Sequence, residues 1–276
     1  MNRFAVLTGF LALLVAVSGG TPPAAVQAQD GEKQLKLRWY GQSYFQLETA
    51  GGKLIVFDPH SMPVFAPPRL SADVTLVSHP HDDHNQIEVL KEKGRDFQGV
   101  TVSKDGKKTD WNVVDEKVGV IRVRTLGTFH DTMNGMQRGK NSVWIVEVDS
   151  LSFVHLGDLG HELSEAQIKA IGKVDVLMVP VGGIYTINGE QAQTVVAKLK
   201  PRLYVLPMHY GVPGYDDIQG PGEFLDGYKT TMKDMTTTNE LVIPADMKAP
   251  DAPVVVQLSW KKAAPKVDPK DPPKKP

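Results

Sequence analysis

The feature that most restricts the fold of this chain is a cluster of histidines and aspartates directly after an apolar segment. Residues 74 to 78 are predicted to form a buried strand, and residues 79 to 84 then read His-Pro-His-Asp-Asp-His. They contain the pattern H-x-H-x-D-H at His79, His81, Asp83 and His84. Burying so many ionisable groups in one loop is costly unless a divalent cation neutralises and coordinates them. The chain must therefore adopt a fold that holds a metal site at the end of a strand.

Further candidate ligands follow three other predicted strands. They are His130, Asp158 and His209, which come after strands predicted over 118–125, 151–156 and 203–206. The ends of different strands can meet at one edge of a sheet, so these side chains can converge on the cluster. The 276-residue chain has no cysteine, which leaves imidazole and carboxylate groups as the available metal ligands.

The order of the predicted elements indicates an α/β fold. Alternating apolar and polar residues over 35–57 predict an antiparallel meander that ends at Asp58-Pro59. Further strands are predicted over 143–148, 174–179 and 254–258, and helices over 87–93, 164–171, 189–199 and 223–235. Ser164 and Gln167 have the spacing of a capping box at the start of one helix. This order fits a four-layer αββα sandwich, in which two sheets pack face to face with helices outside.

With these motifs, the chain resembles the metallo-β-lactamase superfamily, in particular a branch similar to ascorbate-6-phosphate lactonase and other metal-dependent hydrolases. The resemblance covers about residues 36 to 211. It rests on Asp58-Pro59, the cluster at 79 to 84, His130, Gly157-Asp158, residues 207 to 210 (Pro-Met-His-Tyr) and residues 179 to 186 (Val-Pro-Val-Gly-Gly-Ile-Tyr-Thr).

The resemblance implies two divalent metal ions. One would be held by His79, His81 and His130, the other by Asp83, His84 and His209, and Asp158 would bridge them. Asp58 would orient a ligand from outside the metal shell. Zinc is expected for such ligands, with manganese or iron as alternatives. Drug-degrading lactamases lack a bridging carboxylate, so the chain is not expected to be a true β-lactamase.

These expectations lead to a metal-dependent hydrolase of a small ester, lactone or phosphoester. A hydroxide bridging the two metal ions would be the nucleophile, and Asp83 would accept or relay a proton. One alternative is a phosphodiesterase acting on lipid or nucleotide. Another is a protein of the same fold that binds metal or a solute without turnover.

Candidate substrate contacts lie in three other segments. Phe65, in a proline-rich loop, could form an apolar wall or belong to a surface connection. Tyr185 could offer a hydroxyl beside the turn at Gly182-Gly183, and Asn141 could contact substrate or cap a strand. Arg138 and Lys140 could meet an anionic group or form a solvated turn. The unassigned histidines are expected to be structural; they are His60, His155 and His161.

The two ends of the chain differ from the predicted hydrolase domain at 29–260. Residues 1–28 resemble a secretory signal, with Arg3, an apolar run and small residues before Gln29, so the protein is expected to be periplasmic or secreted. An uncleaved membrane anchor is the alternative, although the apolar run falls short of the roughly 20 residues that span a bilayer. Residues 261–276, rich in lysine and proline, are expected to form a disordered tail.

Charge restricts the partners of the domain. Between residues 29 and 260 the chain has 24 basic and 30 acidic residues. This acidic balance argues against nucleic acid as a partner and favours a small-molecule substrate. After cleavage of the signal no stable membrane span is expected. The natural substrate, the metals and the oligomeric state are not determined by the sequence.

Overall fold

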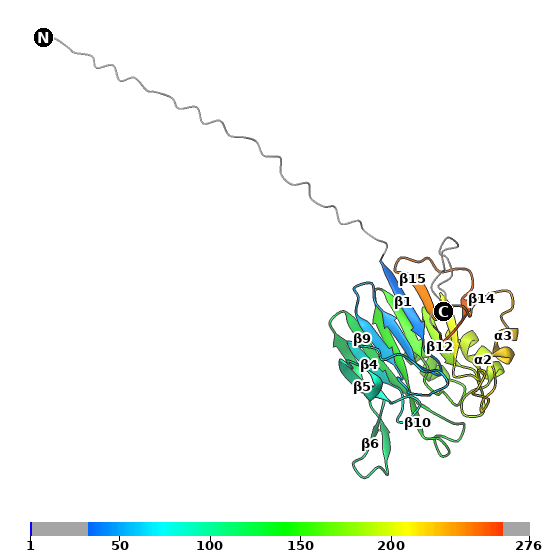
Figure 1. Ribbon diagram of the computed structural model, residues 1–276. Helices are drawn as coiled ribbons and strands as arrows, with labels where there is room; N and C mark the ends of the chain where they lie inside the picture. The colour runs from blue at the N-terminus through cyan, green and yellow to red at the C-terminus, as the bar shows by residue number, and fades with distance from the viewer. Residues whose placement is uncertain (2–32, 262–276) are drawn as a thin grey trace, which may run out of the picture. The chain divides into compact units, whose positions relative to one another are not determined.

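The computed structural model describes Met1 and residues 33–261 (Figure 1). Apart from Met1, the predicted signal segment lies outside the described residues, and so does the predicted tail from residue 262 onward. In the described part of the chain, no helix has both the length and the apolar character needed to cross a membrane.

Two mixed sheets form the body of the fold. The first contains, in order, β15 (Glu240–Pro244), β1 (Gln34–Trp39), β2 (Phe45–Glu48), β3 (Leu54–Phe57), β4 (Val74–Val77) and β5 (Arg95–Gln98). The second contains, in order, β14 (Met232–Met235), β16 (Val254–Leu258), β13 (Tyr204–Met208), β12 (Val176–Pro180), β11 (Leu151–His155), β10 (Lys140–Val148), β9 (Ile121–Phe129) and β8 (Asp115–Val118). The strands β6 (Val100–Val102) and β7 (Thr109–Trp111) form a separate hairpin.

The core lies between the two sheets because each presents an apolar face to the other. Along β1 the side chains of Leu35, Leu37 and Trp39 are buried, as their alternation predicts. They join one large apolar cluster with residues of the second sheet such as Val143 and Phe153. This arrangement confirms the predicted layered α/β sandwich.

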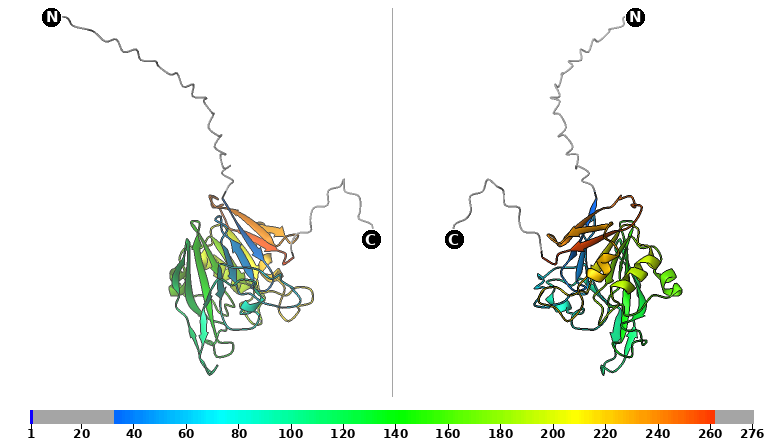
Figure 2. Two further views of the ribbon diagram at one scale, coloured as in Figure 1. Left: turned by 60° about the vertical axis from the view of Figure 1, so that its left-hand side comes forward. Right: turned by 90° about the vertical axis from the view of Figure 1, so that its right-hand side faces the viewer.

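The helices lie outside the sheets (Figure 2). They are η1 (Ile87–Val89), α1 (Glu165–Ile171), α2 (Gly189–Leu199) and α3 (Gly222–Asp226). The helix α1 begins with the predicted capping box between Ser164 and Gln167. The helix α2 buries Ala192, Val195 and Leu199 in the core, which fixes it against the sheet.

Two predicted helices are largely wrong. The helix predicted over 87–93 is only the 3-10 turn η1, because the backbone becomes extended at Leu90 and Lys91 N donates to Leu70 O instead of to a carbonyl of the same turn. The helix predicted over 223–235 ends at Asp226, and residues 232–235 become the edge strand β14. Its parallel pairing with β16 satisfies backbone groups that a helix would otherwise have to satisfy.

The sheet edge where the site forms collects the loops that follow several strands. Asp58 follows β3, the cluster at 79 to 84 follows β4, and His130 follows β9. Asp158 and His209 come after β11 and β13, which are both neighbours of β12. The two sheets therefore bring segments separated by more than 100 residues to one rim.

Candidate metal centre

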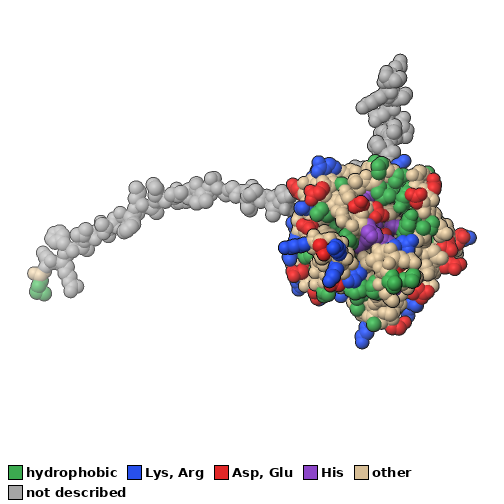
Figure 3. Space-filling view, turned by 90° about the horizontal axis from the view of Figure 1, so that it is seen from below, with side chains coloured by type: hydrophobic (Ala, Val, Ile, Leu, Met, Phe, Trp, Pro, Cys, Tyr) green, Lys and Arg blue, Asp and Glu red, His purple; other side chains and the backbone are tan. Residues whose placement is uncertain are grey.

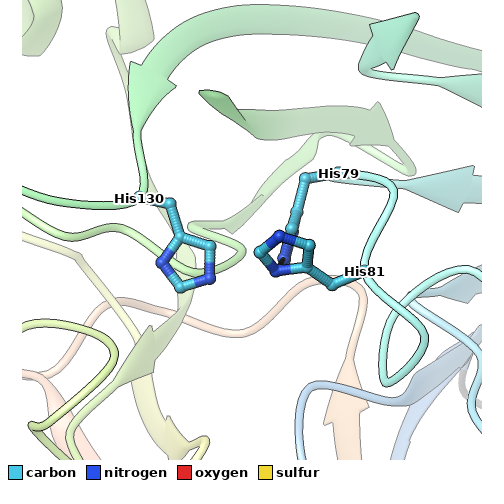
Figure 4. Close-up of side chains that lie close together, drawn as sticks. All are labelled: His79, His81 and His130. Atoms are coloured by element: carbon cyan, nitrogen blue, oxygen red, sulfur yellow. Dashed lines mark hydrogen bonds between the residues drawn. The ribbon is translucent and has the colours of Figure 1, made fainter. Parts of the chain in front are cut away.

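The structure brings the seven sequence-predicted ligands together in two groups. Donor atoms of His79, His81 and His130 all lie within 4.8 Å of one another (Figure 4). The second group, defined by the same distance, contains Asp83, His84, Asp158 and His209.

Asp158 links the two groups. Its Oδ2 atom lies 3.1 Å from Nε2 of His130 in the first group, and 3.1 Å from Nε2 of both His84 and His209 in the second. The Asp158 side chain is 2 % exposed, and its Oδ1 atom is buried without a hydrogen-bond partner. One carboxylate oxygen thus lies beside imidazole nitrogens of both groups, where it is available to a cation held by either group.

Asp58 decides which nitrogen of His84 is free for a metal. Its Oδ2 atom accepts a hydrogen bond of 2.8 Å from Nδ1 of His84. This leaves the lone pair on Nε2, which is buried and has no hydrogen-bond partner of good geometry although it lies 3.1 Å from Asp158 Oδ2. Asp58 itself accepts two further hydrogen bonds from Ser78, at 2.7 and 2.6 Å, so we assign it to orienting His84 rather than to binding metal.

Ser78 extends the same control to His79. Its hydroxyl donates to Asp58, so its oxygen accepts from Nδ1 of His79 at 2.9 Å. Nε2 of His79 then points its lone pair toward Nδ1 of His81, 3.1 Å away. A neutral His81 that carries its proton on Nδ1 donates to Nε2 of His79, and a cation would replace that proton. The lone pairs on Nε2 of His79 and of His84, both in buried rings, therefore suit a divalent cation.

Burial disfavours the charged forms of the ionisable side chains in the centre, and neighbouring charges determine which of these side chains are charged. Burial lowers the pKa of His79, and the charge on His84 lowers it further, so this ring stays neutral. Burial also opposes protonation of His84, but Asp158 and Asp83 outweigh it and raise that pKa well above its ordinary value. For Asp158, burial is outweighed by positive charge on His209 and His84, which holds its pKa well below the usual range. Neutral imidazole and ionised carboxylate are the forms that bind metal, so a cation bound at His84 Nε2 would replace the proton that Asp158 and Asp83 otherwise stabilise on that ring.

Gln42 is a site residue that the sequence analysis missed. Its Nε2 atom donates to Oδ2 of Asp83 at 2.8 Å, and its backbone carbonyl accepts from the N–H of His209 at 3.1 Å. It occupies a left-handed conformation with φ 47° in the turn between β1 and β2. Its position after Gly41, at a turn between two strands near the site, was the only sequence signal available.

The metal centre opens into a cavity of about 340 Å³. It is lined by His81, Asp83, His130, Arg138, Asp158, Tyr185, His209 and Tyr215. Figure 3 shows histidine atoms at the bottom of a hollow, with basic side-chain atoms at its edge. Burial and the charge of Asp83 raise the pKa of Tyr215 to about 12, so its phenol stays protonated as a hydrogen-bond donor.

Of the three predicted substrate contacts, only Tyr185 lines this cavity. Phe65 is 5 % exposed and packs against His60, Tyr215 and Trp260, because its ring completes the apolar core under the loop. The structure thus places it outside the cavity, contrary to the predicted apolar wall.

Asn141 is fully buried and serves the backbone instead of substrate. Its amide donates to Thr128 Oγ1 and Leu156 O, at 2.8 and 2.9 Å, and its Oδ1 atom accepts from the N–H of Asp158 at 3.0 Å. Asn141 therefore positions the loop of Asp158.

The three unassigned histidines lie outside both ligand groups. His60 and His155 hydrogen-bond the carbonyls of Gly41 and Ser43, and Nε2 of His161 accepts from the N–H of Phe129. Each binds backbone, as expected of structural histidines.

Comparison with known proteins agrees with this geometry. A family model described as the β-lactamase superfamily domain matches residues 36–209. A UPF0173 protein of Pyrococcus furiosus is 32 % identical over 204 residues, which cover 69 % of this chain and 89 % of the relative. A UPF0173 metal-dependent hydrolase of Thermococcus onnurineus is 28 % identical over 192 residues, which cover 64 % of this chain and 84 % of the relative.

Two solved structures share the fold. A candidate zinc-dependent hydrolase of the metallo-β-lactamase superfamily from Thermotoga maritima is 30 % identical with a TM-score of 0.63, covering 82 % of this chain and 98 % of that one. Igni18, a metallo hydrolase from Ignicoccus hospitalis, has a TM-score of 0.54 at 20 % identity, with 78 % of this chain and all of that one covered. With a matching family model over 36–209 and two clusters of metal-binding side chains, the chain belongs to the metallo-β-lactamase superfamily and, within it, to the UPF0173 metal-dependent hydrolases.

Proposed function

We propose that this metal-dependent hydrolase uses two metal ions to cleave a small ester, lactone or phosphoester. The observation that carries the proposal is the position of Asp158 Oδ2, 3.1 Å from imidazole nitrogens of both ligand groups. The sequence resemblance to ascorbate-6-phosphate lactonase is the reason for including lactones. A cavity of about 340 Å³ is at the small end of the range for ligand sites, which favours a small substrate.

The residues around the centre would divide the work. When bound, two divalent cations supply water of lowered pKa and polarise a carbonyl or phosphoryl oxygen. Asp83, with 32 % of its side chain exposed, lines the cavity and is oriented by Gln42, and we assign it the role of proton relay. Tyr215 offers a phenolic hydrogen to a substrate oxygen, because its pKa is raised to about 12.

We propose zinc as the metal, with manganese or iron as alternatives. Imidazole and carboxylate ligands suit zinc, and the relative from Thermotoga maritima is described as zinc-dependent.

The proposed site is tested by metal analysis together with a panel of chromogenic esters, lactones and phosphodiesters. We expect close to two metal ions per chain and hydrolysis of at least one class of substrate. His79→Ala is expected to lose both metal and activity, whereas His161→Gln, outside both ligand groups, is expected to keep them. Full activity in His79→Ala would contradict the proposal. A protein that binds two metals but cleaves nothing would instead support the non-catalytic alternative.

A phosphodiesterase acting on lipid or nucleotide is the second candidate. The observation that favours it is Arg138, a cationic side chain that lines the cavity. Preferential cleavage of the phosphodiester probes in the same panel would support this second function over hydrolysis of an ester or lactone.

We also propose that the hydrolase domain, residues 29–260, acts in the periplasm or outside the cell. The support is the sequence of residues 1–28, which has the pattern of a secretory signal, and the tail at 261–276 would follow the domain. The N-terminus of the protein recovered from each cell fraction, identified by mass spectrometry, tests this. An intact N-terminus in the membrane fraction would favour the anchor instead.

A further inference from the structure

The loop after His130 is built around one buried carboxylate. Asp131 is 4 % exposed, and its two oxygens accept hydrogen bonds from the backbone N–H groups of Met133, Gly135, Gln137 and Arg138. These four bonds measure 2.7 to 3.0 Å. A loop held at four points from a residue next to a metal ligand has little freedom to move. It fixes the backbone of Arg138 relative to the metal centre.

The guanidinium group of Arg138 lies over the ring of Tyr185, with its carbon 5.3 Å from the ring centre. Both side chains line the cavity of the metal centre. Stacking on an aromatic ring orients the planar guanidinium and leaves its edge free to donate hydrogen bonds.

Arg138 differs from every other arginine in residues 33–261. Five of them lie within 4 Å of a carboxylate oxygen: Arg38, Arg95, Arg122, Arg124 and Arg202. Arg69 donates instead to two backbone carbonyls. Among the residues that the structure describes, the only side-chain partner of the Arg138 guanidinium is Gln137 Oε1, at a long 3.4 Å. A cation held in place without an anionic partner beside a cavity is available to an anionic ligand.

We infer that Arg138 recognises an oxyanion on the substrate, either a carboxylate or a phosphoryl group, while the metal centre acts on a bond elsewhere in the same molecule. This inference rests on the proposed hydrolase function. The flat fork of a guanidinium matches both oxyanions by paired hydrogen bonds. Arg138 is a specificity-determining residue, and Asp131 and Tyr185 position it.

Lys140 provides a matched control two residues away. Its ammonium donates to Thr109 O and Asp110 Oδ1, at 2.6 and 2.7 Å, and lies 4.8 Å from the ring centre of Trp111. It does not line the cavity. Lys140→Gln and Arg138→Gln therefore remove the same charge from neighbouring positions, but only the second removes it from the cavity.

The first experiment compares p-nitrophenyl esters that share a leaving group and differ in acyl charge: the neutral butyrate, the carboxylated succinate monoester and the 3-phosphonopropanoate. In Arg138→Gln we expect kcat/KM for the charged esters to fall at least about tenfold, mainly through KM, because charge-assisted hydrogen bonds are lost. The butyrate should be cleaved at the wild-type rate. Arg138→Lys should recover part of the loss, and Lys140→Gln should match wild type for all three esters.

The second experiment measures binding of succinate and inorganic phosphate by calorimetry and requires no turnover. We expect the affinity for at least one of the two anions to be about tenfold lower in Arg138→Gln than in Lys140→Gln. The anion that is affected more identifies carboxylate or phosphoryl as the recognised group.

The outcomes separate the two claims. Equal losses in Arg138→Gln and Lys140→Gln, or equal anion affinity in wild type and Arg138→Gln, would overturn the role of Arg138 even if esters are cleaved. If no ester, lactone or phosphodiester of the panel is cleaved but anion binding still depends on Arg138, the hydrolase proposal fails and the oxyanion site stands.

Discussion

Asp58 Oδ2 accepts a hydrogen bond of 2.8 Å from Nδ1 of His84, and this single contact determines that the other ring nitrogen, Nε2, is presented to the metal centre. Both side chains are fully buried, so water cannot replace either partner. The contact joins the end of β3 to the loop after β4. These two strands are neighbours in the first sheet. It makes Asp58 a supporting residue of the centre, and it leads to the first prediction.

Asp58→Asn is expected to weaken metal binding about 10- to 100-fold, because an amide is a poorer acceptor and no longer holds His84 as firmly. Competition with a chelator measures the affinity. Asp96→Asn, at an exposed position of β5, is the control and should bind metal like wild type. Unchanged affinity in Asp58→Asn would show that the hydrogen bond is dispensable.

Asp158→Asn is expected to reduce the metal content by about one ion per chain or more and to abolish hydrolysis. The shared carboxylate would lose its negative charge, while the imidazoles of both groups would remain. Elemental analysis of the purified protein, compared with His79→Ala, tests this. Two ions retained in Asp158→Asn would contradict the shared position of the carboxylate.

Removal of metal by a chelator is expected to lower Tm by roughly 8 °C or more, because a ligand that binds only the folded state stabilises it by mass action. Re-addition of zinc should restore the original value. The double variant with His79→Ala and Asp158→Asn should melt at the same temperature with and without chelator. A chelator effect of equal size in that variant would place the stabilising metal elsewhere.

Gly157→Ala is expected to destabilise the fold by at least about 2 kcal/mol. Gly157 has a φ of +54°, and an added Cβ would lie 2.3 Å from Asn141 Oδ1 and 2.7 Å from Ser78 Cβ. Gly119→Ala is the control, since it has a φ of +62° but open space around it, and should cost about 1 kcal/mol. Urea unfolding measures both variants, and equal costs would show that the close contacts do not matter.

The stability contributed by Asp73 is expected to disappear in acid. Hydrogen bonds from Lys53 and from the N–H of Leu54 lower the pKa of Asp73 below its ordinary value, so the ionised form favours the folded state. This contribution is complete above the ordinary pKa near 4 and is lost as the pH falls through the lower value of the folded protein. Unfolding curves should therefore separate wild type from Asp73→Asn at pH 7 and draw them together at pH 2 to 3. A constant gap across that range would contradict the pKa shift.

Local sequence patterns were sufficient to predict features that depend on residues close together in the chain. The candidate ligands from His79 to His84 lie within six residues of one another, so they stay close wherever the chain turns, and the capping box of Ser164 and Gln167 lies within four residues. The alternation in β1 also determined which face is buried, because side chains alternate along any strand. The sequence by itself thus determined the sandwich class and the candidate ligands.

The tertiary structure decided what depends on distant partners. Residues 232–235 are a strand because β16 lies beside them, and Phe65 is a core residue because His60, Tyr215 and Trp260 surround it. Neither fact follows from local propensity, since the partners lie from five to 195 residues away in the chain. The same holds for Gln42 beside Asp83 and for Arg138 over Tyr185 at the cavity, because these contacts exist only once the sheets have brought the loops together.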